Sequence, residues 1–197
     1  MSKIIIAALS LGGIFGYFFA NDNFIQWSEP MIIVGLSFIL FFVGIDMGYE
    51  GAVLRSIKRA GFKVLIFPIA AIIGTFFGSI VASLVLDLKV NEGLAVGSGF
   101  GWYTLAPFII DPYSQELSAI SFLHNVMREF FSLLIIPVVA KYIGYIETTC
   151  LPGAAAMDVC IPIIERSTST EMVFYSFVSG TVLSTLVPVL VPLFLGL

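Results

Sequence analysis

The sequence predicts an all-α integral membrane protein, a polytopic helix bundle in which two of the helices are broken or re-enter the membrane. Three observations predict this class. The 197-residue chain is 59% hydrophobic and only 11% charged, and its mean hydropathy is +1.06, well outside the balance of a soluble domain. Five apolar stretches reach the roughly 20 residues that a helix needs to cross a bilayer core of about 30 Å. Two further apolar stretches are interrupted by glycine and proline.

The five plain spans form a single transmembrane domain over residues 1–197. We expect them at about 3–20, 29–49, 63–86, 117–140 and 171–196. The first has one lysine followed by an apolar run, the outline of a secretory signal. Phe18 stands where a cleavage site needs a small residue, so we interpret this segment as a retained span.

The two interrupted stretches are predicted broken helices at about 92–110 and 152–166. The first, EGLAVGSGFGWYTLAPFII, contains three closely spaced glycines and then Pro107, and the second, PGAAAMDVCIPII, runs from small residues through Asp158 to Pro162. Irregular backbone at membrane depth is tolerated only where protein or a water-filled cavity satisfies its polar groups. Paired interrupted segments of this kind indicate the binding site of a transporter.

Basic residues set the expected orientation, because cytoplasmic loops carry an excess of them. The loop between the second and third spans holds four, Arg55, Lys58, Arg59 and Lys63. This loop and the amino terminus are therefore expected in the cytoplasm. The carboxyl terminus lies outside whether the chain crosses five or seven times, a choice that depends on Lys141 alone.

The fourth predicted span carries a polar stripe. Its members, spaced by three or four residues, fall within an arc of about 140° on a helix; they are Ser118, Ser121, His124, Asn125, Arg128, Glu129 and Ser132. Glu129 lies about 18 Å along the helix from residue 117, where an unpaired carboxylate costs at least a few kcal/mol. It needs a proton, a cation or Arg128, and Asp158 is the other acid expected at that depth.

Two interpretations of these charges stay open. Arg128, Glu129 and Asp158 form either a buried ion-pair network or a transport site, and intramembrane ionisable residues favour function. His124 is either a proton relay or a hydrogen-bonding partner of a neighbouring helix. Trp102 and Tyr103 either contact substrate or anchor the membrane interface.

Composition and motifs argue against several other classes. A net charge of −4 with no basic run gives nucleic acid no electrostatic footprint. One histidine, no metal-ligand cluster and no nucleophile beside a base make an enzyme the poorest choice. No metal or cofactor is expected, and Cys150 and Cys160 are interpreted as small hydrophobic residues.

Three stretches, GSGFGWYTLA (97–106), NVMREFFSLLIIP (125–137) and PGAAAMDVCIPII (152–164), resemble lysine exporters of the LysO type. The resemblance implies a multi-pass inner-membrane carrier that exports L-lysine and toxic analogues such as thialysine, by proton antiport. The two acids that this family needs fall on Glu129 and Asp158. The chain resembles a short form without an extra amino-terminal membrane segment, which a small membrane protein would supply. A homo-oligomer is left open.

The residues are compatible with that substrate. Lysine carries two ammonium groups, which require acids, and one carboxylate, which requires backbone amides or an arginine. Glu129 and Asp158 suit the amines, and the break around Gly99 and Gly101, or Arg128, suits the carboxylate. With Asn125, His124, Trp102 and Tyr103, these residues form the predicted site for substrate or protons. The alternatives are a cation/proton antiporter of another specificity and the membrane subunit of a two-chain carrier.

Overall fold

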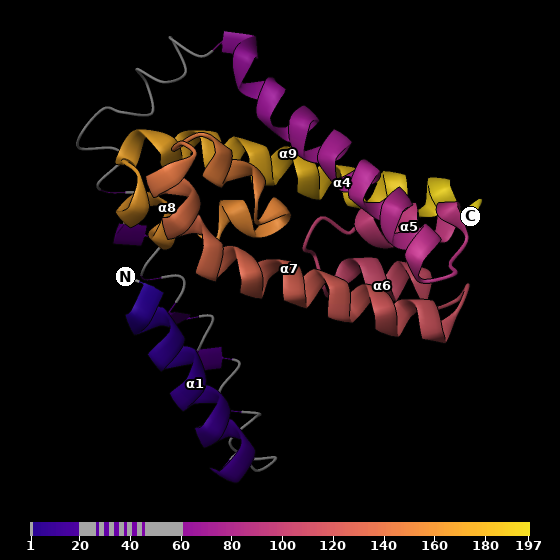
Figure 1. The fold of residues 1–197 in the computed structure, drawn as a ribbon, viewed down its shortest axis with the longest axis horizontal. Helices are drawn as coiled ribbons and strands as arrows, with labels where there is room; N and C mark the ends of the chain where they lie inside the picture. The colour runs from indigo at the N-terminus through magenta and orange to yellow at the C-terminus, as the bar shows by residue number, and fades with distance from the viewer. Residues whose placement is uncertain are drawn as a thin grey trace.

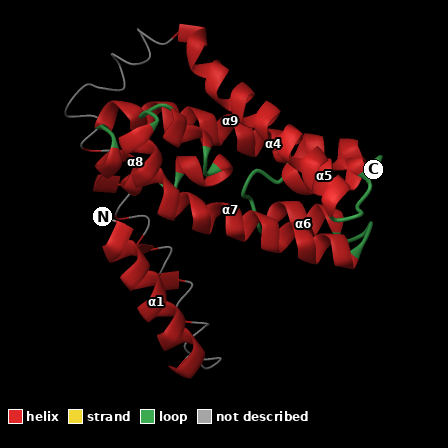
Figure 2. Cartoon of the chain, in the orientation of Figure 1, coloured by secondary structure: helices red, strands yellow, loops and turns green. Residues whose placement is uncertain are grey.

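The computed structural model describes residues 2–19 and 61–197, with scattered helical positions between residues 27 and 45. Most of the predicted span at 29–49, and the basic residues Arg55, Lys58 and Arg59, lie outside the described residues. Every regular element in the described ranges is helical, and no strand occurs among them (Figure 2). The all-α membrane class is confirmed for this part of the chain.

The longest helices in the described ranges are α4 (Ile66–Val85), α7 (Gln115–Tyr142) and α9 (Thr170–Leu195), and α4 runs at an angle to α9 (Figure 1). Each is long and apolar enough to cross a membrane, and each lies within a few residues of a predicted span. Helix α1 (Ser2–Phe19) corresponds to the first predicted span and points away from the bundle (Figure 1).

Short helical pieces replace a continuous helix in both predicted broken segments. The first is divided into α5 (Val90–Gly97) and α6 (Leu105–Ile110), joined by turns. The second is divided into the 3-10 helix η3 (Gly153–Met157) and α8 (Ile161–Ser167). Two further 3-10 helices, η1 (Gly61–Leu65) and η2 (Glu147–Cys150), lead into α4 and follow α7.

Helix α9 is the element against which both broken segments pack. Its side chains Leu183, Val187 and Val191 form one core with Phe100 and Ala95. Further along the helix, Ser176, Gly180 and Ser184 are buried under η3. Small residues at such contacts let backbones approach closely in membranes, where lipid gives no hydrophobic drive for helix association.

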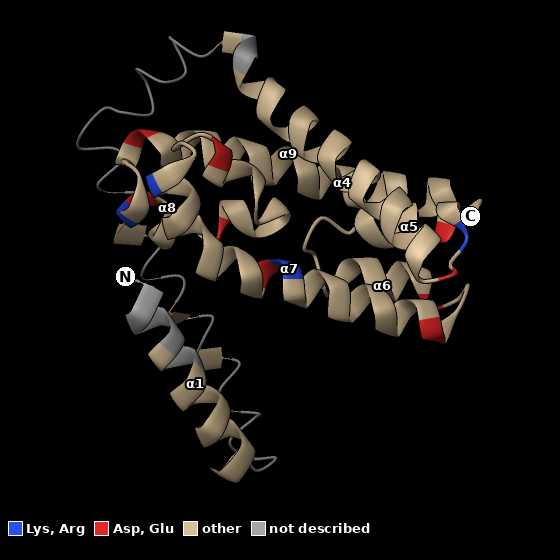
Figure 3. Cartoon of the chain, viewed as in Figure 1, with Lys and Arg blue, Asp and Glu red and all other residues tan. Residues whose placement is uncertain are grey.

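Outward-facing side chains of the long helices are large and apolar. On α4, for example, Ile73 is 64% exposed and Phe77 is 71% exposed, as expected of a face that meets lipid tails. Lys, Arg, Asp and Glu gather at the two ends of the bundle, and α7 alone carries both signs near its middle (Figure 3). These two mid-helix charges are Arg128 and Glu129.

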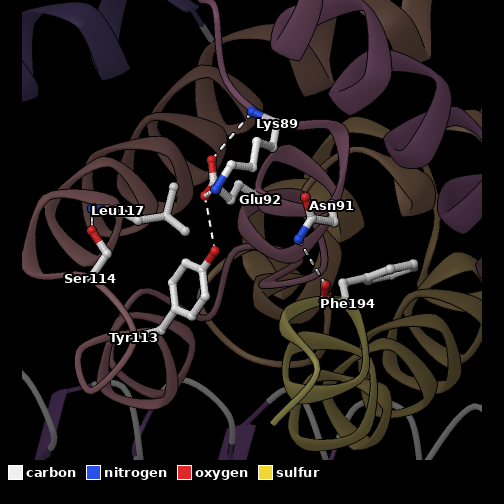
Figure 4. A network of polar contacts seen from close by, with 7 residues as sticks. All are labelled: Lys89, Asn91, Glu92, Tyr113, Ser114, Leu117 and Phe194. Atoms are coloured by element: carbon white, nitrogen blue, oxygen red, sulfur yellow. Dashed lines mark hydrogen bonds and ion pairs between the residues drawn. The ribbon is translucent and has the colours of Figure 1, made fainter.

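A polar network ties three elements together at the end of the bundle where α5 begins (Figure 4). Lys89 makes an ion pair of 3.3 Å with Glu92, whose carboxylate also accepts a hydrogen bond of 3.0 Å from the Tyr113 hydroxyl. Asn91 donates to the carbonyl of Phe194 at 3.4 Å. The start of α5 is thereby held to the turn before α7 and to the end of α9.

Candidate functional site

The two broken segments touch each other through their backbones. The amide N–H of Ala154 donates to the carbonyl of Phe100 at 2.7 Å. Gly101 and Gly153 have φ of +92° and +70°, and a Cβ on Gly153 would lie 2.0 Å from the Phe100 oxygen. Only glycine permits both this conformation and this approach. We call this contact the crossing, defined by Phe100, Gly101, Gly153 and Ala154.

Asn125 on α7 holds the first broken segment at the crossing. Its Oδ1 accepts a hydrogen bond of 2.7 Å from the Gly101 N–H, and its Nδ2 donates to the carbonyl and hydroxyl oxygens of Ser121 at 2.8 and 3.2 Å. Asn125 is fully buried, and a Cβ on Gly99 would meet its amide at 2.5 Å. The side-chain amide of Asn125 is therefore already hydrogen-bonded to backbone groups.

Arg128, one turn further along α7, holds the residue that leads into the second broken segment. Its Nε donates to the carbonyl of Leu151 at 3.1 Å, and its Nη1 donates to the hydroxyl of Thr75 on α4 at 3.1 Å. The guanidinium also lies 5.9 Å from the centre of the Phe100 ring, within reach of a cation–π interaction. The alternative of a buried ion-pair network is not found among the described residues, where the single ion pair joins Lys89 and Glu92.

Glu129 and Asp158 line one small cavity beside the crossing. The cavity has a volume of about 270 Å³, just below the range of about 300–1,000 Å³ usual for small-molecule sites. Its lining comes from both broken segments and α7; the residues are Gly101, Trp102, Tyr103, Thr104, Glu129, Ala154, Ala155, Met157, Asp158 and Val159. Both acidic side chains are partly buried. We call it the acid cavity.

The two carboxylates are held differently within the acid cavity. Asp158 follows η3 and accepts a hydrogen bond of 2.5 Å from the N–H of Val159. Glu129 projects from the middle of α7 and interacts electrostatically with Asp158. Tyr103 lies within electrostatic reach of both. Two like charges facing one enclosed space favour a cation or a proton between them.

A second hollow lies on the other side of Arg128. This groove, between α4, α5 and α7, has a volume of about 660 Å³. Small and apolar residues dominate its walls, which also include Arg128 and His124; the others are Thr75, Gly78, Ser79, Ala82, Ser83, Leu86, Leu88, Gly93, Val96, Gly97, Ile120, Leu123, Met127 and Phe131.

The structure distributes the predicted site residues over three places. Five of them line the acid cavity, namely Glu129, Asp158, Gly101, Trp102 and Tyr103. Arg128 and His124 line the groove instead, and Asn125 and Gly99 are packed against each other beneath the crossing. The side chains of the polar stripe therefore contact several different elements, because their arc on α7 is wide enough to face more than one of them.

The sequence analysis did not predict which apolar neighbours of Asp158 line the acid cavity. Ala154, Ala155, Met157 and Val159 line the acid cavity beside Asp158, and their place in the same broken segment was the available signal. Nothing in the sequence indicated that Thr75 is a hydrogen-bond partner of Arg128, since Thr75 lies in an otherwise apolar span.

The chain matches the family model described as lysine exporter LysO over residues 6–195. It belongs to this family. In Escherichia coli, the family protein named lysine exporter LysO is 30% identical over 174 residues, which cover 87% of this chain and 57% of the relative. A Haemophilus influenzae protein named "Putative lysine exporter" is 27% identical over 195 residues, covering 96% of each chain.

The resemblance of the three motifs to the LysO family is thereby confirmed over nearly the whole sequence. The chain spans a little over half the length of the Escherichia coli relative. No solved structure matches the chain. The LysO family is named for lysine export.

Proposed function

We propose that this chain exports L-lysine, and toxic analogues such as thialysine, across the inner membrane by proton antiport. The observation that carries the proposal is that Glu129 and Asp158 face one small cavity formed by both broken segments. The names of the family and its relatives supply the substrate class. The predicted topology places the amino terminus in the cytoplasm and the carboxyl terminus outside.

Competition for the same carboxylates would couple the two fluxes. A carboxylate holds either a proton or an ammonium group, so binding of one releases the other. Trp102 and Tyr103 line the same cavity and offer aromatic faces to a cation. The N–H groups of the glycine break already donate hydrogen bonds within the protein, that of Gly101 to Asn125 and that of Trp102 to Gly99, so the lysine carboxylate is assigned to no amide of this break.

The membrane potential explains why a driving ion is needed. Moving one positive charge outward against a negative-inside potential costs about 2.3 kcal/mol per 100 mV. No GxxxxGK[ST] motif for nucleotide binding occurs in the sequence. Proton entry supplies the free energy in this scheme.

Proton flux driven by lysine in proteoliposomes tests the proposal. An outward lysine gradient should drive proton movement in the wild type, whereas Glu129→Gln and Asp158→Asn should each abolish it. The matched control is Glu116→Gln, which changes an exposed acid at the start of the same helix and should leave flux unchanged. Unaltered flux in both cavity variants would remove the mechanism.

Two other results would identify the alternative functions. Flux that ignores lysine and follows sodium would indicate a cation/proton antiporter of different specificity. Flux that appears only when a second membrane protein is co-reconstituted would indicate one half of a two-chain carrier. The part of the Escherichia coli relative that this chain does not match is the observation that favours testing this arrangement.

A further inference from the structure

Arg128 lies in the wall between the acid cavity and the groove. A Cβ on Gly101 would lie 3.8 Å from the Arg128 Cδ, and a Cβ on Gly153 would lie 3.2 Å from its Nε. The stem of the arginine therefore packs directly against the crossing. Arg128 lines the groove, whereas Glu129, the next residue, lines the acid cavity, because successive side chains on a helix point about 100° apart.

No acid neutralises this guanidinium within the part of the chain that the structure describes. Its hydrogen-bond acceptors are the carbonyl of Leu151 and the hydroxyl of Thr75, and both oxygens are neutral. Charged groups inside membrane proteins are normally paired, because removing a charge from water without a partner is costly. The guanidinium is therefore a positive charge in the wall that no direct ion pair within the described residues neutralises.

The position of this charge is fixed by more than one contact. Nε is held by Leu151, Nη1 is held by Thr75 on α4, and the Phe100 ring lies beside the guanidinium. The three partners come from the residue just before the second broken segment, a long helix and the first broken segment. The guanidinium therefore stays at the crossing as long as both broken segments remain in contact.

We propose that Arg128 is an electrostatic barrier that prevents cations from leaking between the acid cavity and the groove while the crossing is closed. A fixed positive charge beside a narrow passage repels cations, as arginine does at the constrictions of selective pores. The acid cavity attracts the cations that such a barrier must stop. The inference goes beyond the proposed function, since it concerns leakage without substrate and assigns no ligand to Arg128.

Passive proton entry into liposomes tests this barrier in the absence of any amino acid. Purified full-length protein is reconstituted, a negative-inside potential is imposed with potassium and valinomycin, and an enclosed pH-sensitive dye reports proton entry. Arg128→Gln removes the charge but keeps hydrogen-bond donors, and Arg128→Lys keeps the charge but loses the planar fork. Lys141→Gln is the matched control, because it removes an exposed cation near the end of the same helix.

The rate of passive proton entry should depend on the positive charge at position 128. We expect Arg128→Gln to leak about tenfold faster than the wild type, the scale of one charge acting over about 12 Å at an effective dielectric constant near 20. Arg128→Lys and Lys141→Gln should stay as tight as the wild type. Circular dichroism and gel filtration establish that each variant is folded before reconstitution.

Three outcomes would overturn the barrier. If proton entry through Arg128→Gln equalled that of the wild type, the charge would not limit the leak. If Arg128→Gln and Arg128→Lys leaked protons equally, the hydrogen bonds of the arginine, and not its charge, would limit it. Leakage of Lys141→Gln would show a general effect of lost charge. Because no lysine is present, failure of lysine-driven antiport leaves this test intact, and a leak result does not decide the substrate.

Discussion

Asn125 accepts a hydrogen bond of 2.7 Å from the backbone N–H of Gly101. This bond joins the most irregular point of the first broken segment, where φ is +92°, to the middle of α7. The same helix carries Glu129 one turn later, on a side chain that reaches the acid cavity. Asn125 therefore positions the glycine break relative to the acid, which is a different role from the substrate or proton binding that the sequence predicted.

Replacing Asn125 by alanine should lower the stability of the protein. The variant leaves the N–H of Gly101 buried without a partner, which costs about 1–3 kcal/mol. Thermal unfolding in detergent measures the change. Asn91→Ala is the control, because Asn91 is exposed and its hydrogen bond to Phe194 is 3.4 Å long; its melting temperature should stay close to the wild type. Equal melting temperatures for both variants would contradict the positioning role.

Gly153→Ala should separate the two broken segments. The new Cβ would lie 2.0 Å from the carbonyl oxygen of Phe100, and the residue would have to keep a φ of +70°. We expect a loss of about 1–3 kcal/mol of unfolding free energy, typical of overpacking in a closed interior. Cysteine crosslinking or hydrogen exchange at the crossing should report greater opening.

Gly74→Ala is the matched control for that change. Gly74 lies on the exposed face of α4, and nothing lies within 4 Å of its added Cβ. The substitution should be neutral or slightly stabilising, since alanine is the better helix former by about 1 kcal/mol. If Gly153→Ala behaved like Gly74→Ala, the close backbone approach at the crossing would be wrong.

Gly180→Ala should reduce transport more than it reduces stability. Its Cβ would lie 2.6 Å from the backbone nitrogen of Met157, the residue before Asp158, so η3 must move away from α9. Lysine-driven flux and thermal unfolding are measured on the same preparation. We expect flux to fall at least about tenfold, since a displacement of about 1 Å at a functional group can cost more than that.

The control for Gly180 is Gly78→Ala on α4, where no atom lies within 4 Å of the added Cβ. It should keep wild-type flux and stability. Normal flux in Gly180→Ala would mean that the position of Asp158 does not depend on its packing against α9. The contacts of Ser176 with the carbonyl of Ala156 and of Ser184 with the sulfur of Met157 would then hold η3 against α9.

Glu92 should make the end of the bundle sensitive to acid. Burial raises the pKa of its carboxyl, but the hydrogen bonds from Tyr113 and Lys89 and the Lys89 charge outweigh that effect, and the pKa lies below its ordinary value. A lowered pKa in the folded state contributes stability above the unfolded pKa, and this contribution is lost as pH falls through the folded pKa.

Comparing the wild type with Glu92→Gln across pH tests this linkage. The wild type should melt at a higher temperature at pH 7, and the difference should shrink as the pH falls below the ordinary range of a glutamate. The effect is small, because Lys89 is 74% exposed and solvent screens its charge. A difference that grows toward acid would reverse the sign and contradict the assignment.

Much of the fold was predictable because lipid limits what a membrane-spanning chain can do. Every backbone group at membrane depth must be satisfied internally, so long apolar runs become helices. The structure has helices over residues 66–85, 115–142 and 170–195, and the glycine and proline positions marked both breaks. The expectation that Asp158 lies near Glu129 followed from the rarity of acids in such segments, and both residues line the acid cavity.

The sequence by itself determined the class of the protein, its family, the two interrupted segments and the pair of acids, because hydropathy, helix breakers and intramembrane charges are local properties. Only the tertiary structure decided that Arg128 turns from the acids toward Thr75 and Leu151, and that the amide of Asn125 is committed to Gly101. The hydrogen-bond partners of Arg128 and Asn125 depend on which polar groups of other elements lie within reach of α7 at the crossing. These partners are distant from Arg128 and Asn125 in the sequence, so no local sequence pattern predicts the contacts.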